Sequence, residues 1–516
     1  MSKVRVPEIP WAWAWTAVVL VFPWSNAFMS IATAWLGLVT ISHALNPSPS
    51  VRKTPFSKAL GRTGWALMLL VLWSGLSVLW GGEPQACLHD VRVKLPLAVG
   101  GWAMVTMARS SSNLEASQVK FMLKMAVISA GLATLSLMVW DILDGGQTGG
   151  RQSSHFISHI RFGLWWALLL PWTGHLLGRR WMWGCLIGAV TTWTWMQGAT
   201  GLLAGVAMAP WWLSALGKKK SGIPEGVPWP PAATVRRHAA LIAVGLVPVV
   251  LLLIRALPTA LPQAEGLPEQ TQAGETYVHK TERRVTENGH FVWTHLAWGE
   301  LKAAWGQRSD TPYDEVQGAL VRFLTSKGLA KDAEGVAALS AAELEAVANR
   351  VTSTVELEGG SWQKRWNRFK FNWGQWLDGH RSPNASVLAR AVYMEVAVDA
   401  WFALPLLNKT IGVGAGRAGV EIEEGFMRSF PDWPPAGRKR PHNQYLTFAL
   451  ALGTVGLGLL LYALSSMWAH SPCQPGVVLL ALSCLTEDTL ETQAGVTLAV
   501  VALALGAFVK VGEARQ

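Results

Sequence analysis

Charged residues and cysteines are scarce in this chain of 516 residues. Only 15% of the residues are charged, whereas 51% are hydrophobic and 30 are tryptophan, which excludes an ordinary soluble enzyme and favours a polytopic membrane protein. The four cysteines give no disulfide framework, because Cys185 and Cys484 fall in apolar stretches, Cys473 falls in a predicted inner turn and only Cys87 falls on the predicted outer side.

Apolar stretches recur along the whole chain, several of them near the minimum length that a bilayer requires. They predict an all-α, polytopic membrane protein with about twelve transmembrane helices. We expect an N-terminal membrane domain (1–257, about nine spans), a large, mainly helical outer domain (258–442) before the tenth span, and C-terminal spans (443–516). The stretches are 11–22, 25–46, 64–81, 95–108, 121–141, 162–177, 181–196, 202–216, 239–257, 443–466, 476–487 and 495–511.

Lysine and arginine in the connections set the expected orientation, because cytoplasmic loops carry an excess of both. With a cytoplasmic N-terminus, one consistent register places residues 258–442 outside and both termini inside. The formal net charge of +11 then reflects this bias and requires no nucleic-acid partner. The basic residues predicted to lie inside are Lys3, Arg5, Arg52, Lys53, Lys58, Arg62, Arg109, Lys120, Arg179, Arg180, the run 218–220, Arg236, Arg237, Lys510 and Arg515.

The long outer segment has the pattern of a small helical domain after a proline-rich linker. Apolar residues recur at helical spacing from Tyr313 to Leu324, and Ser340 with Glu343 forms a capping box ahead of another apolar face. Residues 362–376 alternate aromatic and basic side chains. This stretch is either an interfacial helix with snorkelling cations or a surface for an anionic lipid or a glycan.

The predicted spans hold almost no ionisable residue at mid-depth, which argues against a pump, channel or proton-coupled transporter. Cations gather instead where spans meet the predicted outer surface. There, arginine could grip phosphate oxygens with two hydrogen bonds, although any one of these cations could also be a simple headgroup anchor. The set comprises Arg92, Lys94, Arg151, His155, His159, Arg161, Arg390, Arg440 and His442.

Three motifs resemble the O-antigen ligase and O-antigen polymerase superfamily, and two further stretches, LTEDTLETQAG (485–495) and SKGLAKDAEG (326–335), are similar to variants in its ligase-like branch. RPHNQYLTFALALGTVG (440–456) is similar to the family's outward His-Asn pair at the start of a late span with a GxxG end. ARAVYMEVAVDAWFALPLLNKTIGVGAG (389–416) and SHIRFGL (158–164) resemble its two other elements. Where many members carry a Ser-Arg pair, this chain has MQGATGLLAG (196–205), which leaves one family contact in doubt.

The resemblance implies a metal-independent, inverting glycosyltransferase of the bacterial inner membrane, with no cofactor and a periplasmic active site. Such enzymes move a glycan from an undecaprenyl-pyrophosphate carrier to a hydroxyl, which for the ligases belongs to the lipid A-core. His442 is then the catalytic base, since a free imidazole titrates at a pH of about 6.5. Arg161 and Arg390 bind the pyrophosphate, with Arg92, Lys94 and Arg440 as weaker candidates, and Asn443, His159 and Tyr445 support the site.

The sequence also allows alternative functions and alternative ligand sites. An O-antigen polymerase would use the same chemistry with a second lipid-linked glycan as acceptor, and a transporter of the lipid-linked glycan would perform none. His155 and His159 could bind zinc if helical, although no third ligand is visible. Gly414, Gly416 and Gly419 spell GxGxxG, but no βαβ context accompanies them, so a tight turn is favoured over a nucleotide site. The sequence leaves the oligomeric state unknown.

Overall fold

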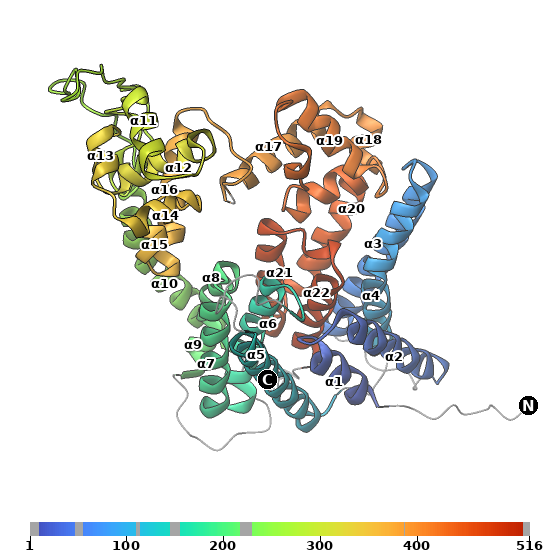
Figure 1. Ribbon diagram of the computed structural model, residues 1–516. Helices are drawn as coiled ribbons and strands as arrows, with labels where there is room; N and C mark the ends of the chain where they lie inside the picture. The colour runs from blue at the N-terminus through green and yellow to red at the C-terminus, as the bar shows by residue number, and fades with distance from the viewer. Residues whose placement is uncertain are drawn as a thin grey trace, which may run out of the picture. The chain divides into compact units, whose positions relative to one another are not determined.

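The computed structural model describes residues 10–46, 55–109, 114–144, 155–216, 230–385 and 387–508. These residues form twenty-two α-helices and one short antiparallel ladder of β1 (Thr286–Glu287) with β2 (His290–Phe291) (Figure 1). The prediction of a mainly helical protein is therefore confirmed. Some of the cations discussed above lie outside the described residues: Lys3, Arg5, Arg52, Lys53, Arg151, the run 218–220, Lys510 and Arg515.

The chain divides into two compact units, residues 1–245 with 393–516 and residues 246–392. Helix α10 (Ala232–Arg255) begins in the first unit and ends in the second, and α17 (Leu388–Ala403) does the reverse. The other α-helices of the first unit are α1 (Trp11–Val21), α2 (Asn26–Leu45), α3 (Pro55–Leu76), α4 (Pro84–Arg109), α5 (Ala116–Leu143), α6 (His159–Trp172), α7 (Arg179–Trp195), α8 (Ala199–Ala207), α9 (Ala209–Leu216), α18 (Leu406–Ile411), α19 (Ala418–Ser429), α20 (Gln444–Trp468), α21 (Gln474–Thr486) and α22 (Gln493–Leu505).

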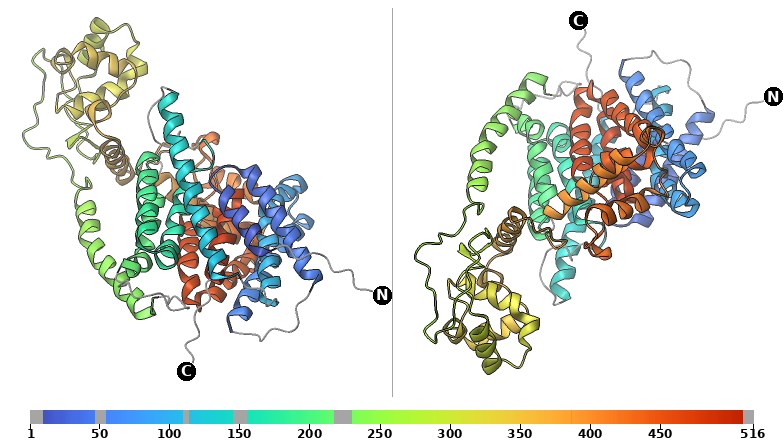
Figure 2. Two further views of the ribbon diagram at one scale, coloured as in Figure 1. Left: turned by 90° about the horizontal axis from the view of Figure 1, so that it is seen from below. Right: turned by 90° about the horizontal axis from the view of Figure 1, so that it is seen from above.

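Two helices form the centre of the first unit. Every residue of α22 from Ala494 to Leu505 is buried, and so is every residue of α6 from Arg161 to Trp172. A helix that is apolar all round must be enclosed by other helices. Accordingly α22 packs against α2, α4, α6 and α21, and α21 and α22 (red) lie between the blue helices α1–α4 and the green helices α7–α9 (Figure 2).

Five described helices are long and apolar enough to cross a membrane, or six if the bent pair α8 and α9 is one span. The five are Asn26–Leu45, Ser57–Leu79, Ala116–Leu143, Ala232–Arg255 and Gln444–Trp468. All twelve predicted stretches overlap helical residues, yet the count of about twelve spans is not confirmed, because others such as α1 and α22 have only 11 and 13 residues. The four cysteines are buried and free.

Helix α20 is broken at Gly453, whose φ is +68°. The break frees backbone carbonyls that must find other donors in an apolar setting. The backbone N–H groups of Val413 and Gly414 donate to the carbonyls of Leu450 and Ala451 at 2.9 and 3.0 Å, and the Trp73 indole donates to that of Leu452 at 2.9 Å. The glycine turn predicted near Gly414 thus serves to hold this break.

The second unit contains short helices around their own core. They are α11 (Trp298–Arg308), α12 (Tyr313–Ser326), α13 (Ala333–Ala337), α14 (Ala341–Ala348), α15 (Thr354–Glu358) and α16 (Ser361–Leu377). The core is built from side chains such as Trp305, Leu320 and Phe323. The helical spacing from Tyr313 and the Ser340–Glu343 capping box are both confirmed, at α12 and α14.

Candidate active site at the start of α20

The segment before α20 is held in one conformation by a network of hydrogen bonds. Asn443 is the N-cap, and its Oδ1 accepts from the Leu446 N–H at 3.1 Å while its Nδ2 donates to the Leu485 carbonyl at 3.1 Å. His442 has a φ of +50°, a left-handed conformation that costs free energy for a residue other than glycine. Its backbone N–H donates to Asp488 Oδ2 at 3.2 Å, which helps to fix this conformation.

The His442 side chain lies between a carboxylate and an aromatic ring. Its Nδ1 is 3.4 Å from Glu487 Oε2, and its ring centroid is 5.9 Å from that of Tyr393. The His442 side chain is 30% exposed, whereas that of Glu487 is 7% exposed. The imidazole is therefore oriented from its buried side and remains accessible from the other.

Three carboxylates come from the short connection between α21 and α22, residues 487–492, which we term the acidic loop. Two cations predicted to bind pyrophosphate pair with its Glu491. Lys94 Nζ lies 3.0 Å from Glu491 Oε1, and Arg440 Nη1 lies 2.7 Å from Oε2. Lys94 also pairs with Asp90, one helical turn earlier on α4. Because Lys94 is only 2% exposed, it is an internal ion-pair residue rather than a free surface cation.

Arg161 approaches the acidic loop from the start of α6. Its Nη2 donates to the Asp488 carbonyl at 3.2 Å, and its Nε is 3.5 Å from Thr492 Oγ1. Its Nη1 is buried and has no hydrogen-bond partner among the described residues. An unpaired guanidinium N–H in a buried position is costly, which makes this atom the natural point for an incoming acceptor oxygen.

The pKa shifts of Glu491 and Asp488, two of the three acidic side chains of the loop, have opposite directions. Burial alone would raise the pKa of Glu491, but the charges of Lys94 and Arg440 outweigh it and lower the pKa to about 2. Burial raises the pKa of Asp488 above its ordinary value, although Thr447 donates a hydrogen bond to it at 2.6 Å. Glu491 is thus the fixed negative charge of the site.

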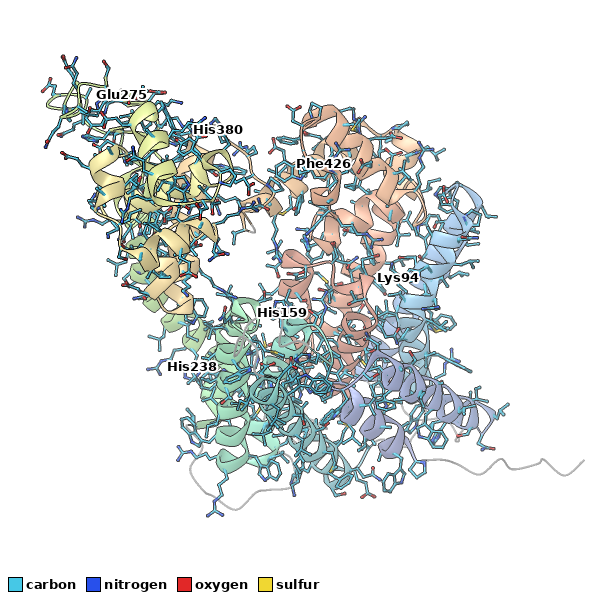
Figure 3. The ribbon with its side chains drawn as sticks, in the orientation of Figure 1. Lys94, His159, His238, Glu275, His380 and Phe426 are labelled. Carbon is cyan, nitrogen blue, oxygen red and sulfur yellow. The ribbon has the colours of Figure 1, made fainter. Side chains whose placement is uncertain are left out.

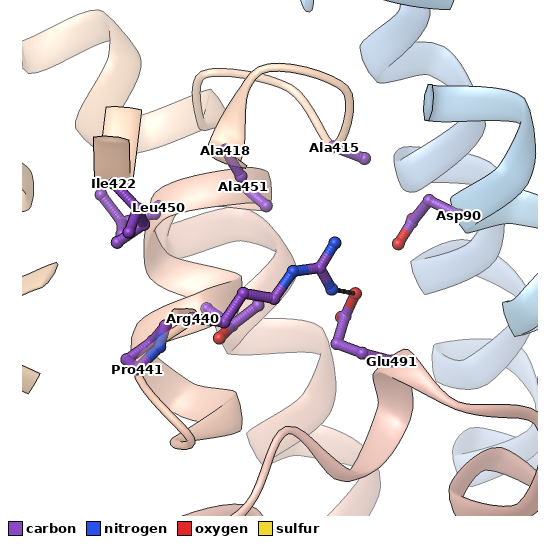
Figure 4. A pocket seen from close by; sticks show the side chains of 10 residues that line it. Asp90, Ala415, Ala418, Ile422, Arg440, Pro441, Leu450, Ala451 and Glu491 are labelled. Atoms are coloured by element: carbon purple, nitrogen blue, oxygen red, sulfur yellow. Dashed lines mark hydrogen bonds and ion pairs between the residues drawn. The ribbon is translucent and has the colours of Figure 1, made fainter. Parts of the chain in front are cut away.

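A small pocket opens beside this network, between α4, the glycine turn, α19 and α20. Figure 4 shows Arg440 and Glu491 paired on its wall, with Asp90 opposite and with the apolar side chains of Ala418 and Ile422 nearby. The cations Lys94, Arg161 and Arg440 number three and the carboxylates Asp90, Glu487, Asp488 and Glu491 number four. The assembled charges are therefore nearly balanced, with one more carboxylate than cations.

The remaining predicted residues occupy varied positions. Arg92 is exposed on α4, and half-buried His159 is the first residue of α6 (Figure 3). Half-buried Tyr445 donates its hydroxyl to the Ala481 carbonyl at 3.0 Å, which ties α20 to α21. Arg390 precedes Tyr393 by one helical turn on α17, at the end of the second unit. The structure thus brings Lys94, Arg161, Arg440 and His442 to the acidic loop.

Sequence reasoning assigned no role to Asp90, Gln444, Glu487, Asp488 or Glu491. Gln444 donates from Nε2 to Glu491 at 3.1 Å and accepts the Leu490 N–H at 2.6 Å. The signal was present in the sequence, because three acids within the five residues 487–491 stand out in a chain with 15% charged residues. Asp90 could also have been found from its position four residues before Lys94 on a helix.

The two rival sites gain no support from the geometry. His155 Nε2 pairs with Asp141 Oδ1 at 3.2 Å, and the described residues contain no group of three or more His, Cys, Asp or Glu side chains that could hold a metal ion. Gly414 packs against Gly81, because a Cβ on it would lie 2.4 Å from the Gly81 Cα. Its role in close backbone packing needs no nucleotide.

No protein-family model matches this chain, and a search of curated proteins finds no match. The family resemblance therefore rests on the sequence motifs alone.

Proposed function

We propose that this chain is a lipid-linked glycan transferase of the O-antigen ligase type. It joins a glycan from an undecaprenyl-pyrophosphate carrier to a lipid A-core hydroxyl at the periplasmic face of the bacterial inner membrane. The observation that carries the proposal is the half-buried imidazole of His442, which is oriented by Glu487 of the acidic loop, the same loop that Arg161 contacts from α6. We further propose that the chain crosses the membrane about twelve times and that residues 258–442 contain a periplasmic domain.

The chemistry begins with the proton of the acceptor hydroxyl. With Nδ1–H donated to the Glu487 carboxylate, His442 Nε2 is the free base. As the acceptor oxygen attacks the anomeric carbon, Nε2 takes the proton, and the carbon–oxygen bond to the pyrophosphate breaks on the opposite face of the sugar. Glu487 stabilises the imidazolium that forms.

The leaving pyrophosphate needs positive charge, and Arg440, Arg161 and Lys94 differ in how readily each could contact a phosphate. Arg440 is 54% exposed, so a phosphate can reach its guanidinium, and Glu491 keeps its second ion pair, with Lys94, if Arg440 turns to the phosphate. Arg161 can add a phosphate oxygen at its unpaired Nη1 without losing a bond. We assign these two arginines to the pyrophosphate and assign Lys94 to holding the acidic loop, because its charge is already shared by two carboxylates.

Purified protein in liposomes tests the proposal. It is supplied with an undecaprenyl-pyrophosphate-linked glycan and a lipid A-core acceptor, and product is followed on glycolipid gels. Transfer by the wild type, its loss in His442→Ala and retained donor binding in that variant would support the enzyme. Transfer by His442→Ala at the wild-type rate contradicts it.

A transporter is the second candidate, favoured by the broken helix α20 and by the 57° bend between α8 and α9, since discontinuous helices often form transporter binding sites. Movement of the donor across the liposome membrane without any new glycosidic bond, and unchanged in His442→Ala, would establish that function instead.

A further inference from the structure

A second hollow lies in the first unit, on α5, α6 and α7, and no part of the proposed chemistry uses it. It is an open groove lined by Val127, Gly131, Trp166, Arg180, Trp181, Gly184 and Gly188, which we term the α5–α7 groove. Chain direction places it apart from the candidate active site. Helix α6 starts near Arg161 and is followed by a turn at Gly178, so Arg180 lies at the opposite end of α6 from Arg161.

Helices α5 and α7 run parallel along the two sides of this groove. At one end Lys124 Nζ lies 5.9 Å from the ring centroid of Trp181, and at the other end the hydroxyls of Thr134 and Thr192 are hydrogen-bonded at 2.8 Å. Lys124 and Thr134 are ten residues apart on α5, which corresponds to about 15 Å of helix. The hydrocarbon core of a bilayer is about 30 Å thick, so the groove has the depth of one leaflet.

The floor of the groove is apolar and has room for an occupant. A Cβ added at Gly131 or Gly184 would meet no atom within 4 Å, whereas one at Gly188 would lie 2.5 Å from the Trp166 ring. The neighbouring side chains of Leu132 and Ile187 are 53% and 65% exposed, as expected for surfaces that face lipid. Helix α5 is itself long and apolar enough to cross a membrane.

Among the described residues at the α5–α7 groove, positively charged side chains lie at one end. Lys124 and Arg180 lie at that end, and among the described residues neither forms an ion pair with a carboxylate. Basic pockets between transmembrane helices are suited to anionic lipid headgroups, and an aromatic ring such as Trp181 is suited to the interface. We propose that the α5–α7 groove binds one anionic phospholipid, with its headgroup on Lys124 and Arg180 and an acyl chain along Gly131 and Gly184.

Native mass spectrometry of the detergent-purified full chain tests this site, with phosphatidylglycerol and phosphatidylcholine as probes. The wild type should bind one phosphatidylglycerol in clear preference to phosphatidylcholine. Gly184→Leu fills open space in the groove and should weaken phosphatidylglycerol binding at least about tenfold. Gly245→Leu is the matched control, because Gly245 is also an exposed helical glycine with no atom within 4 Å of an added Cβ, and it should bind as the wild type does.

A charge variant keeps the proposal testable if Gly184→Leu misfolds, which size-exclusion chromatography would reveal. The double variant Lys124→Gln/Arg180→Gln should lower affinity for phosphatidylglycerol about thirtyfold and leave that for phosphatidylcholine unchanged. The pair Arg236→Gln/Arg237→Gln, exposed on α10, is its control. Equal binding of the two lipids by the wild type, or wild-type binding by a folded Gly184→Leu or charge variant, would overturn the proposal.

Discussion

Replacing Glu491 with glutamine removes the carboxylate that Lys94 and Arg440 share, and we expect this change to destabilise the fold by about 3 kcal/mol. The pKa of Glu491 falls from 4.5 to about 2 in the folded protein. A difference of about 2.5 units at about 1.4 kcal/mol per unit gives about 3 kcal/mol. Removing one partner of a buried ion pair typically costs about 3–5 kcal/mol, which is the same range.

The sign of the pH dependence follows from the lowered pKa. A carboxylate with a depressed pKa contributes stability above the unfolded value near 4.5, and this stability is lost as the pH falls through the folded value of about 2. Wild type and Glu491→Gln should therefore differ by a constant amount at neutral pH, and the difference should shrink between pH 4.5 and 2. Unfolding titrations in mixed micelles give both free energies.

A double-mutant cycle isolates the ion pair between Lys94 and Glu491 within this network. Lys94→Met and Glu491→Gln should each be destabilising alone, and the double variant should cost about 1–3 kcal/mol less than their sum. Thr497→Val is a suitable control, because Thr497 is buried on α22 and its hydroxyl bonds only to the Gln493 carbonyl one turn earlier among the described residues. The assigned ion pair would be refuted if Glu491→Gln destabilised the protein by less than about 1 kcal/mol. It would also be refuted if the loss in the double variant equalled the sum of the two single losses.

Three further predictions concern catalysis and the helix break. Glu487→Gln should lower the turnover rate by about 10²- to 10⁴-fold with an unchanged KM for the donor, because the amide no longer stabilises the imidazolium of His442; a change in KM alone would speak against this role. Arg161→Lys should lower the transfer rate strongly at normal protein level, because lysine lacks the planar fork of the guanidinium, whereas the exposed control Arg236→Lys should have no effect. Wild-type transfer should continue in EDTA. Full activity of Arg161→Lys would contradict the assignment. Gly453→Ala should lower the free energy of unfolding by more than about 2 kcal/mol in unfolding titrations, because the φ of Gly453 is +68° and an added Cβ would lie 2.2 Å from the Thr410 carbonyl oxygen. Gly458→Ala is the control and should be neutral or stabilising, because an added Cβ there would meet no atom within 4 Å.

Local patterns in the sequence were sufficient for most of the helices. Apolar periodicity located α12, and the Ser340–Glu343 capping box located the start of α14, because both depend on neighbours within one or two turns. The number of spans was harder to predict. The stretch near residues 476–487 matches α21 (Gln474–Thr486) to within two residues, but this helix has only 13 residues, fewer than a membrane span usually needs.

The site was only partly predictable, because its partners are distant in sequence. Position at the start of a span singled out His442, Arg161 and Lys94, whereas the pairing of Lys94 with Glu491 joins residues 397 apart. Sequence reasoning treated the outer cations as one basic ring. The fold instead pairs two of them, Lys94 and Arg440, with the carboxylate of Glu491, an arrangement that depends on tertiary packing of α4 against the acidic loop.

The most direct test of the proposed glycan transferase activity is the rate of His442→Gln, which keeps the polarity and approximate size of the side chain but cannot take up a proton. In liposomes with lipid-linked glycan and lipid A-core acceptor, the variant should lose about two to four orders of magnitude in rate while it still binds the donor. A His442→Gln variant that transfers glycan at nearly the wild-type rate would contradict the account, because His442 would then be only a structural residue at the start of α20.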